Sequence, residues 1–115
     1  MPMPKISIVI PALNEEQDLP HLLESIKNQT FTDYEVIVAD AGSKDKTIEI
    51  AKSYGAHVVP GGMPGPGRNR GAAAAKGEFL FFFDSDVILP HDFLQGALAE
   101  MQDRFLDLAT CEFKP

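Results

Sequence analysis

The chain has 115 residues, of which 44% are hydrophobic and 23% charged, and its formal net charge is −7 at pH 7. This length allows one domain, or one piece of a larger domain, with a real core, and the abundance of bulky apolar residues excludes intrinsic disorder. The acidic balance argues against nucleic-acid binding, and a single cysteine, Cys111, excludes a disulfide framework within the chain and a cysteine-rich zinc site.

Targeting signals are absent from the sequence as it stands. The longest run of bulky apolar residues spans 79–83, which is far shorter than a membrane span, and the N-terminus lacks the apolar core of a signal peptide. We therefore expect a cytoplasmic location, with membrane association possible for a longer full-length protein.

The first predicted elements are a strand and a helix. Residues 6–10 (ISIVI) are a β-branched run typical of a buried strand, which Pro11 is expected to end. Asn14 is a candidate helix N-cap, with Gln17 in the capping-box position three residues later. The helix that follows has apolar residues at i, i+3, i+4 and i+7, namely Leu19, Leu22, Leu23 and Ile26.

Further strands and helices alternate along the rest of the chain. The patterns predict strands at 36–39, 57–59 and 79–83, helices at 46–53, 68–76 and 90–105, and a Gly/Pro loop at 60–67. This alternation indicates βαβ units. We predict an α/β fold with three layers, α/β/α, in which helices cover both faces of a mostly parallel sheet of about four strands.

Polar clusters follow the predicted strands and the Gly/Pro loop, at residues 11–16, 40–43, 68–71 and 84–86. The carboxyl ends of parallel strands meet at one edge of a sheet, where ligands bind in such folds. The four clusters are therefore expected to open onto one shared rim.

Among the four clusters, Asp84-Ser85-Asp86 points to the most specific chemistry. In an extended segment, residues i and i+2 point to the same side, so the two carboxylates would lie together. Oxygen ligands of this kind suit Mg²⁺ or Mn²⁺. The alternative is a solvated turn whose aspartate caps the next helix, but the preceding apolar run at 79–83 favours the metal site.

The other clusters offer groups that suit a nucleotide. An ionised Asp40 can accept a hydrogen bond from a nucleobase N–H or a ribose hydroxyl, or it can cap a turn. Arg68 can bind a phosphate through two parallel hydrogen bonds, or it can be a solvated helix start. The backbone of 11–13 can lie along a flat base, and Asn14 and Glu15 can cap a helix and still contact a ligand.

Together these residues resemble family-2 glycosyltransferases with the GT-A fold. The matching segments follow the family's order and cover nearly the whole chain: ISIVIPALNEEQDL, EVIVADAGSKDKTIEIA and GRNRGAAAAKGEFLFFFDSDVILP. The resemblance implies an enzyme that transfers a sugar, with inversion, from a UDP- or GDP-sugar to an acceptor hydroxyl. It also implies Mg²⁺ or Mn²⁺ as the cofactor.

The resemblance also implies roles for individual residues. The nucleotide-sugar site would consist of Pro11, Ala12, Asn14, Glu15, Asp40, Arg68, Asp84 and Ser85. Asp40 would contact the base, and Arg68 would lie near the diphosphate. Asp86 would be the direct metal ligand, while Asp84 would contact the ribose or a metal-bound water. The chain departs from the family's frequent Asp-Asp-Gly-Ser by having Ala41 in the second position.

The resemblance assigns residues 1–115 to the N-terminal, donor-binding portion of such an enzyme. The acceptor-binding half, with the catalytic general base, is expected to follow, so no residue of this chain is assigned as the base. The acceptor, whether saccharide, lipid or protein, is unknown. A sheet without its later strands would expose an edge, which predicts self-association into a homo-oligomer.

Three alternatives remain open on the sequence. The first is a non-catalytic fragment that binds a nucleotide. The second is a haloacid-dehalogenase-type phosphatase, in which Asp84 would be the nucleophile, although Ile88 departs from that motif. The third is a dinucleotide-binding module, for which Gly65, Gly67 and Gly71 have a spacing that does not match G-x-G-x-x-G.

Overall fold

A computed structural model describes residues 4–61, 71–104 and 112–113. Its centre is a five-stranded sheet with the order β3-β2-β1-β4-β5, in which every neighbouring pair of strands is parallel. The strands are β1 (Ile6–Ala12), β2 (Tyr34–Asp40), β3 (His57–Pro60), β4 (Phe79–Phe82) and β5 (Glu112–Phe113). The helices are α1 (Leu19–Lys27), α2 (Thr47–Ser53) and α4 (Phe93–Arg104). The predicted α/β class is confirmed.

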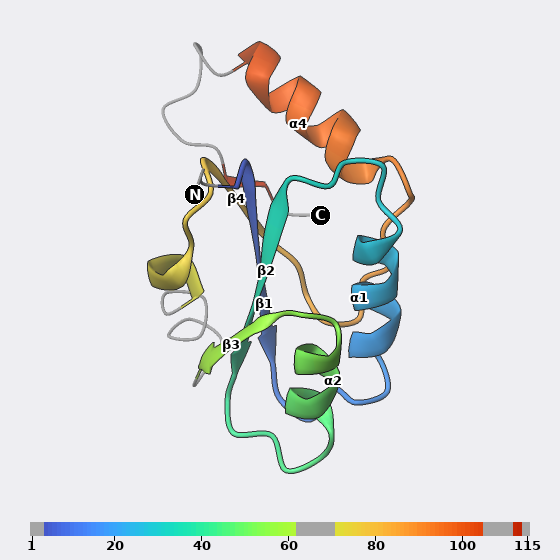
Figure 1. Ribbon diagram of the computed structural model, residues 1–115, viewed down its shortest axis with the longest axis vertical. Helices are drawn as coiled ribbons and strands as arrows, with labels where there is room; N and C mark the ends of the chain where they lie inside the picture. The colour runs from blue at the N-terminus through green and yellow to red at the C-terminus, as the bar shows by residue number, and fades with distance from the viewer. Residues whose placement is uncertain (1–3, 62–70, 105–111, 114–115) are drawn as a thin grey trace.

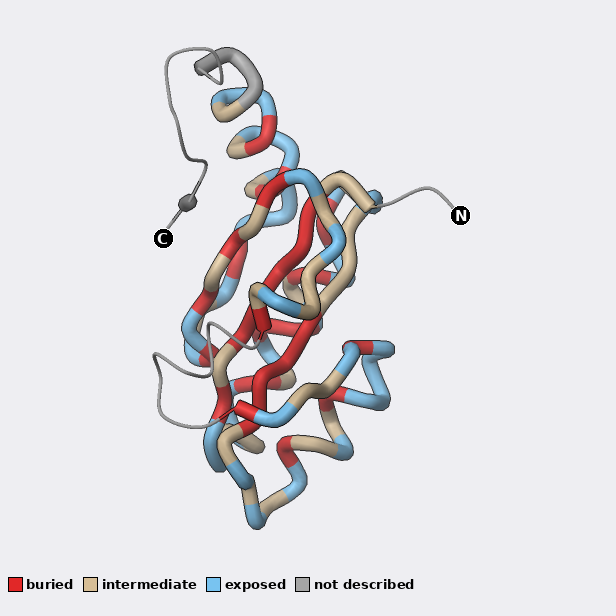
Figure 2. Tube along the Cα trace, turned by 90° about the vertical axis from the view of Figure 1, so that its left-hand side faces the viewer, coloured by how far each residue is buried: buried red, intermediate tan, exposed pale blue. Residues whose placement is uncertain are grey.

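The main core lies between the sheet and α1. Alternate residues of β1 point to this side, and Ile6, Ile8 and Ile10 are fully buried there. They pack in one cluster with the predicted stripe of α1, whose four apolar residues are all buried. Figure 2 shows the buried residues as a nearly continuous path along the central strands.

Helical segments lie on both faces of the sheet, as predicted. Figure 1 shows α1 and α2 on one side and the short helical segment 71–74 on the other. A Cβ atom at Gly71 would overlap the side chain of Val9, which points away from the main core. The third layer therefore approaches β1 closely at a position where only glycine fits.

Phe83, the residue after β4, links this strand to α4 through two aromatic contacts. The rings of Phe81 and Phe83 meet edge to face with centroids 6.1 Å apart, and Phe83 meets Phe93 in the same way at 5.8 Å. The predicted helix over 90–105 begins at Phe93 instead, after a turn in which the Phe93 N–H donates to the Pro90 carbonyl.

The prediction that Asn14 caps the first helix was wrong. The helix begins at Leu19, Asp18 occupies the N-cap position without a side-chain cap hydrogen bond, and Asn14 adopts the left-handed backbone conformation with φ 53°. Pro11 does not end β1 either, because the ladder continues to Ala12, which pairs with Asp40.

Two further differences concern the second half of the chain. The two-residue strand β5, which pairs with β4, was not predicted. Of the helix predicted over 68–76, residues 71–74 are helical and 75–76 are not, while 68–70 lie outside the described residues. Among the helices of the described ranges, none is long and apolar enough to cross a membrane.

Candidate functional site

The carboxyl ends of three neighbouring strands form one rim of the sheet. In the register of the sheet, Ala12 pairs with Asp40 and Asp40 pairs with Pro60, so β1, β2 and β3 end at the same level. The backbone N–H of Phe83 donates to the carbonyl of Val9, which brings the residues after β4 to this end. The predicted clusters at 11–16, 40–43 and 84–86 thus lie at one end of the sheet, the lower end in Figure 1.

Asp40 is buried at this rim, with 6% of its surface exposed. Its Oδ2 accepts hydrogen bonds from the backbone N–H of Gly42 (2.9 Å) and of Ser43 (2.8 Å), and its Oδ1 accepts one from the Ser43 hydroxyl (2.5 Å). An ionised carboxylate has about four acceptor positions. Three are used by the turn that follows β2, and the one that the described residues leave unused is on Oδ1.

The backbone around Asp40 is fixed on both sides. The N–H of Gly61 donates to the Asp40 carbonyl at 2.6 Å, and the N–H of Ala41 donates to the Ala12 carbonyl at 2.9 Å. A Cβ atom at Gly61 would lie 2.8 Å from the carbonyl oxygen of Ala39, so only glycine allows this approach. Asp40 is therefore held through its own strand and through both neighbouring strands.

Asn14 joins the β1–α1 loop to the β2–α2 loop. Its backbone N–H donates to the Ser43 hydroxyl oxygen, and its side-chain Oδ1 accepts from the backbone N–H of Lys44, both at 2.8 Å. Because this side chain reaches across to the second loop, it is not available to cap α1. Its contact explains the positive φ, which Asn tolerates better than most residues.

A second set of hydrogen bonds lies beside the first. The backbone N–H of Glu15 donates to the Thr47 hydroxyl at 2.8 Å, and that hydroxyl donates to Oδ1 of Asp45. The backbone N–H of Glu16 donates to Oδ2 of Asp45 at 3.2 Å, and the Glu16 side chain accepts from the N–H of Lys46 at 3.1 Å. We call the hydrogen bonds between residues 14–16 and 43–47 the rim network.

The rim network also sets the charge state of Asp45. Partial burial raises the pKa of this carboxyl. Hydrogen bonds from the Thr47 hydroxyl and from the backbone N–H groups of Thr47 and Glu16 lower the pKa, and together they outweigh the effect of burial. The net result is a pKa below the ordinary range, so Asp45 is ionised at neutral pH.

The two remaining predicted residues of the β1 end are differently exposed. Ala12 is buried and Pro11 half-buried, as the last two residues of the strand. Leu13, which follows them, has 50% of its surface exposed at the rim. This segment presents backbone and an apolar side chain to solvent, as contact with a flat base would require.

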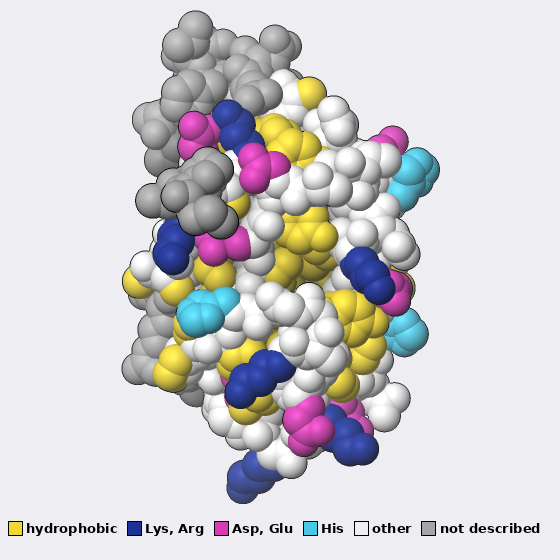
Figure 3. Space-filling model, in the orientation of Figure 1, with side chains coloured by type: hydrophobic (Ala, Val, Ile, Leu, Met, Phe, Trp, Pro, Cys, Tyr) yellow, Lys and Arg dark blue, Asp and Glu magenta, His cyan; other side chains and the backbone are white. Residues whose placement is uncertain are grey.

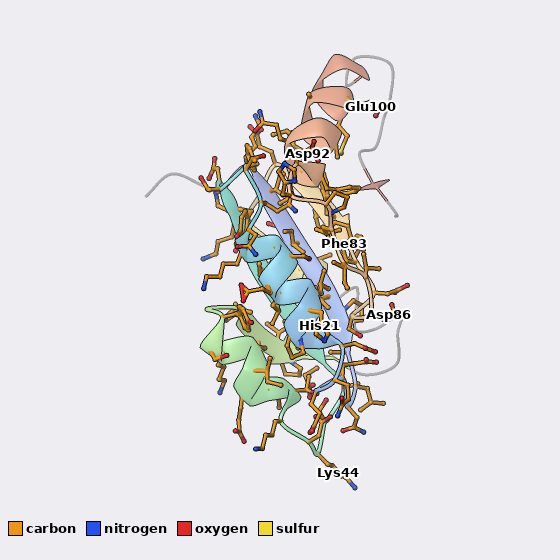
Figure 4. All side chains as sticks on the ribbon, turned by 90° about the vertical axis from the view of Figure 1, so that its right-hand side faces the viewer. His21, Lys44, Phe83, Asp86, Asp92 and Glu100 are labelled. Carbon is orange, nitrogen blue, oxygen red and sulfur yellow. The ribbon has the colours of Figure 1, made fainter. Side chains whose placement is uncertain are left out.

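Asp84, Ser85 and Asp86 form a turn, not the extended segment that the sequence suggested. The backbone N–H of Val87 donates to the Asp84 carbonyl at 3.1 Å, which closes the turn. Asp84 and Asp86 are exposed, whereas Ser85 is buried with 6% of its surface accessible. In Figure 4, Asp86 lies nearer than Phe83 to the end of the molecule at which Lys44 projects.

The donor set of this turn limits what kind of cation it fits. Within the described ranges, no group of three or more His, Cys, Asp and Glu side chains comes together as metal ligands. Two exposed carboxylates, Asp84 and Asp86, fit a hard cation that fills its other positions with water and phosphate oxygens, as Mg²⁺ does. They do not fit a closed structural metal site.

Charges of both signs are mixed at the rim. Figure 3 shows lysine and acidic side chains side by side at the lower end of the molecule, where the loops that precede α1 and α2 lie. A phosphate here would meet no stripe of positive charge among the described residues of this face, so it needs backbone donors, a cation or a single basic group. Arg68, the predicted diphosphate contact, lies outside the described residues.

The sequence reasoning placed Ser43 in a polar cluster but assigned no bridging role to Ser43 or Thr47. Each hydroxyl accepts an N–H from the β1–α1 loop and donates to a nearby carboxylate, that of Asp40 or Asp45. The Asp-x-Gly-Ser spacing signals a local turn around Asp40. It carries no signal for partners that lie about thirty residues away along the chain.

Comparison with known proteins decides the family. Residues 7–114 match the family model described as glycosyl transferase family 2. The chain belongs to glycosyl transferase family 2. Poly(ribitol-phosphate) beta-N-acetylglucosaminyltransferase TarS of Staphylococcus aureus is 32% identical to it, over 97% of this chain and 21% of TarS.

Solved structures of relatives agree with the GT-A assignment. The structure of S. aureus TarS 1–349 in complex with UDP-GlcNAc matches with a TM-score of 0.79 and 32% identity, over 88% of this chain and 32% of that one. Glucosyl-3-phosphoglycerate synthase from Mycobacterium tuberculosis, solved with Mn²⁺, UDP and glucosyl-3-phosphoglycerate, matches with a TM-score of 0.69 and 35% identity, over 86% of this chain and 39% of that one. The chain spans about a fifth to a third of the length of the curated relatives it matches.

Proposed function

We propose that this chain is the donor-binding part of an inverting glycosyltransferase that uses a UDP-sugar. One observation carries the proposal: the rim of β1, β2 and β4 belongs to a fold that matches TarS in complex with UDP-GlcNAc over 88% of this chain. Ligands of open parallel sheets bind at the carboxyl ends of the strands. GDP-sugars remain the second class of donor to test.

The residues at the rim then take complementary roles. Pro11, Ala12, Asn14 and Glu15 line one side of the nucleotide through their backbone and side chains. Asp40, whose Oδ1 keeps one acceptor position that the described residues do not use, takes a hydrogen bond from the base. Arg68 contacts the diphosphate, and Asp84 and Ser85 contact the ribose side of the donor.

A divalent cation is the second part of the proposal. Asp86, with Asp84, would hold Mg²⁺ or Mn²⁺ in the turn that closes at Val87. When bound, such a cation would act as a Lewis acid and neutralise charge on the leaving diphosphate. Asp84 and Asp86 are exposed, which would leave room for phosphate oxygens and water around it.

The acceptor side is proposed to lie outside residues 1–115. Inversion requires a general base that removes the proton of the acceptor hydroxyl, and no residue of this chain is assigned to that role. The acceptor can be a saccharide, a lipid or a protein. We further propose a cytoplasmic location, with membrane association in a longer parent protein.

Calorimetric titration tests the donor site. We expect the chain to bind UDP and UDP-GlcNAc in the presence of Mn²⁺, GDP at least tenfold more weakly, and UDP weakly without the metal. Asp86→Ala should abolish the effect of Mn²⁺, whereas Asp33→Ala, an exposed aspartate at the amino end of β2, should leave UDP binding unchanged. Failure of every nucleotide diphosphate to bind would overturn the proposed function.

A non-catalytic nucleotide-binding fragment is the second candidate, favoured by the fraction of its relatives that the chain spans. This candidate predicts that the chain binds UDP and produces neither transfer nor hydrolysis of UDP-GlcNAc. Release of GlcNAc by the chain alone would contradict it. Family membership leaves the phosphatase and dinucleotide-binding alternatives without a supporting observation.

Self-association follows from the edges of the sheet. In the described sheet, β3 has a strand neighbour on one side only. We propose that this edge allows a homo-oligomer, which light scattering at increasing protein concentration would detect. A constant monomer mass would contradict it.

A further inference from the structure

The Ser43 hydroxyl stands between two residues of the proposed donor site. It accepts the backbone N–H of Asn14 at 2.8 Å and donates to Oδ1 of Asp40 at 2.5 Å. The Ser43 backbone N–H donates to Oδ2 of the same carboxylate at 2.8 Å. One residue therefore contacts both oxygens of Asp40 and also holds the start of the other loop.

This arrangement determines how the Asp40 carboxylate is oriented. Oδ2 accepts two backbone N–H groups, whereas among the described residues Oδ1 accepts only the Ser43 hydroxyl. The acceptor position that the described residues leave unused is therefore beside the hydroxyl, on the oxygen that the hydroxyl fixes. Without the bond at Oδ1 the carboxylate would be held through Oδ2 alone, so Oδ1 could take a wider range of directions.

The same hydroxyl also helps to fix the conformation of the β1–α1 loop. Asn14 has a positive φ of 53°, which is a costly conformation for a residue other than glycine. The hydrogen bond from its N–H to Ser43 and the one from Lys44 to its side chain hold it there. The loop that includes Asn14 and the carboxylate of Asp40 are thus placed relative to each other by Ser43.

We propose that Ser43 is a positioning residue for the nucleotide, acting through Asp40 and Asn14 without touching the ligand. The proposal rests on the proposed function, because it needs a nucleotide at the rim. Oriented hydrogen-bond acceptors increase affinity because less freedom is lost when the ligand binds. Removal of the Ser43 hydroxyl therefore weakens nucleotide binding even though every proposed contact residue is still present.

The experiment is a calorimetric titration of the full chain with UDP in the presence of Mn²⁺. We expect Ser43→Ala and Ser43→Val to bind UDP about tenfold more weakly than the unchanged protein, in line with the loss of one hydrogen bond to a charged group. Ser43→Thr, which keeps the hydroxyl and is close in shape to the Val variant, should bind within about twofold of the unchanged protein.

Ser25→Ala is the matched control, because the Ser25 hydroxyl also bridges two segments. It donates to the Leu22 carbonyl at 2.7 Å and accepts the N–H of Leu89 at 3.1 Å, away from the rim loops. We expect this variant to lose stability and to keep its affinity for UDP. Equal loss of UDP affinity in Ser25→Ala and Ser43→Ala would overturn the proposal, since the effect would then be one of general stability.

The proposed function and the positioning role of Ser43 fail in different ways. If the unchanged protein does not bind UDP, the proposed function fails. If it binds UDP and the folded Ser43→Ala and Ser43→Val variants bind equally well, only the positioning role fails. If these variants do not fold, NMR titration of the unchanged protein with UDP replaces them. Shifts of the Ser43 and Asn14 amide signals would support the positioning role of Ser43. Unchanged signals of both residues would overturn it.

Discussion

Two hydrogen-bond networks connect separate segments of this molecule, and they differ in charge. At the far end of α1, the buried side chain of Gln29 donates to the carbonyls of Ser25 (3.1 Å) and Pro90 (2.5 Å) and accepts from the N–H of Leu94 (2.9 Å). Both N–H groups of this amide and one acceptor position of its oxygen are used, and no charge is involved.

The rim network lies beside carboxylates that carry charge. Asp40 is as buried as Gln29, the described residues leave one acceptor position of its carboxylate unused, and Asp45 is ionised. The neutral Gln29 network stabilises a contact between α1 and α4. The turn after β2 instead holds the Asp40 carboxylate in a fixed orientation at the edge of the sheet, which is what binding of a ligand requires.

The largest effect is expected when the neutral Gln29 network is broken. Gln29→Leu should lower the free energy of unfolding by about 3 kcal/mol, because it leaves the buried Leu94 N–H without its partner and removes one of the two hydrogen bonds to the Pro90 carbonyl. Urea unfolding measures this value. Asn28→Ala, at the exposed neighbouring position, should cost less than about 0.5 kcal/mol, and similar losses in both variants would refute the distinction.

The rim network should give a smaller loss when its second hydroxyl is removed. Thr47→Val keeps the shape of this fully buried side chain but takes the acceptor from the Glu15 N–H and one donor from Asp45. We expect a loss of about 1–2 kcal/mol in urea unfolding, because a backbone donor is left unsatisfied. Thr47→Ser should retain most of the stability, and a loss as large as that of the Val variant would show that the methyl group, not the hydroxyl, matters.

The smallest effect is a dependence of stability on pH that the Gln29 network cannot have. Because the folded protein lowers the pKa of Asp45, this carboxylate contributes stability above its unfolded pKa and loses that contribution as the pH falls through the folded value. Urea unfolding between about pH 5 and pH 3 should therefore show a steeper decline for the unchanged protein than for Thr47→Val. Parallel pH profiles for the two proteins would contradict this link.

Local patterns in the sequence were enough for four of the five strands and for the apolar face of α1. The β-branched run of β1 and the four-residue stripe of α1 are properties of neighbouring residues, and both were predicted correctly. The start of α1 was not, because Asn14 is engaged by Lys44, a residue thirty positions later whose approach no local rule describes.

At the candidate site, too, features set by neighbouring residues were predicted and features set by distant residues were not. The polar residues after each strand were predicted to meet at one rim, because parallel strands bring their carboxyl ends together. The turn at Asp84–Asp86 was mistaken for an extended segment, since β4 ends at Phe82, one residue before the apolar run does. The bridging roles of Ser43 and Thr47 depend on the fold and were not predicted.

The cross-loop contacts of Asn14 have a consequence for protein engineering. The partners in the rim network are separated by 29 to 32 positions in the chain, so each loop's conformation depends on the sequence of the other. A graft that takes residues 11–16 from another family member would import donors and acceptors without their counterparts. Exchange of donor preference between relatives should therefore move residues 11–16 and 40–47 as one cassette, with the strands between them left in place.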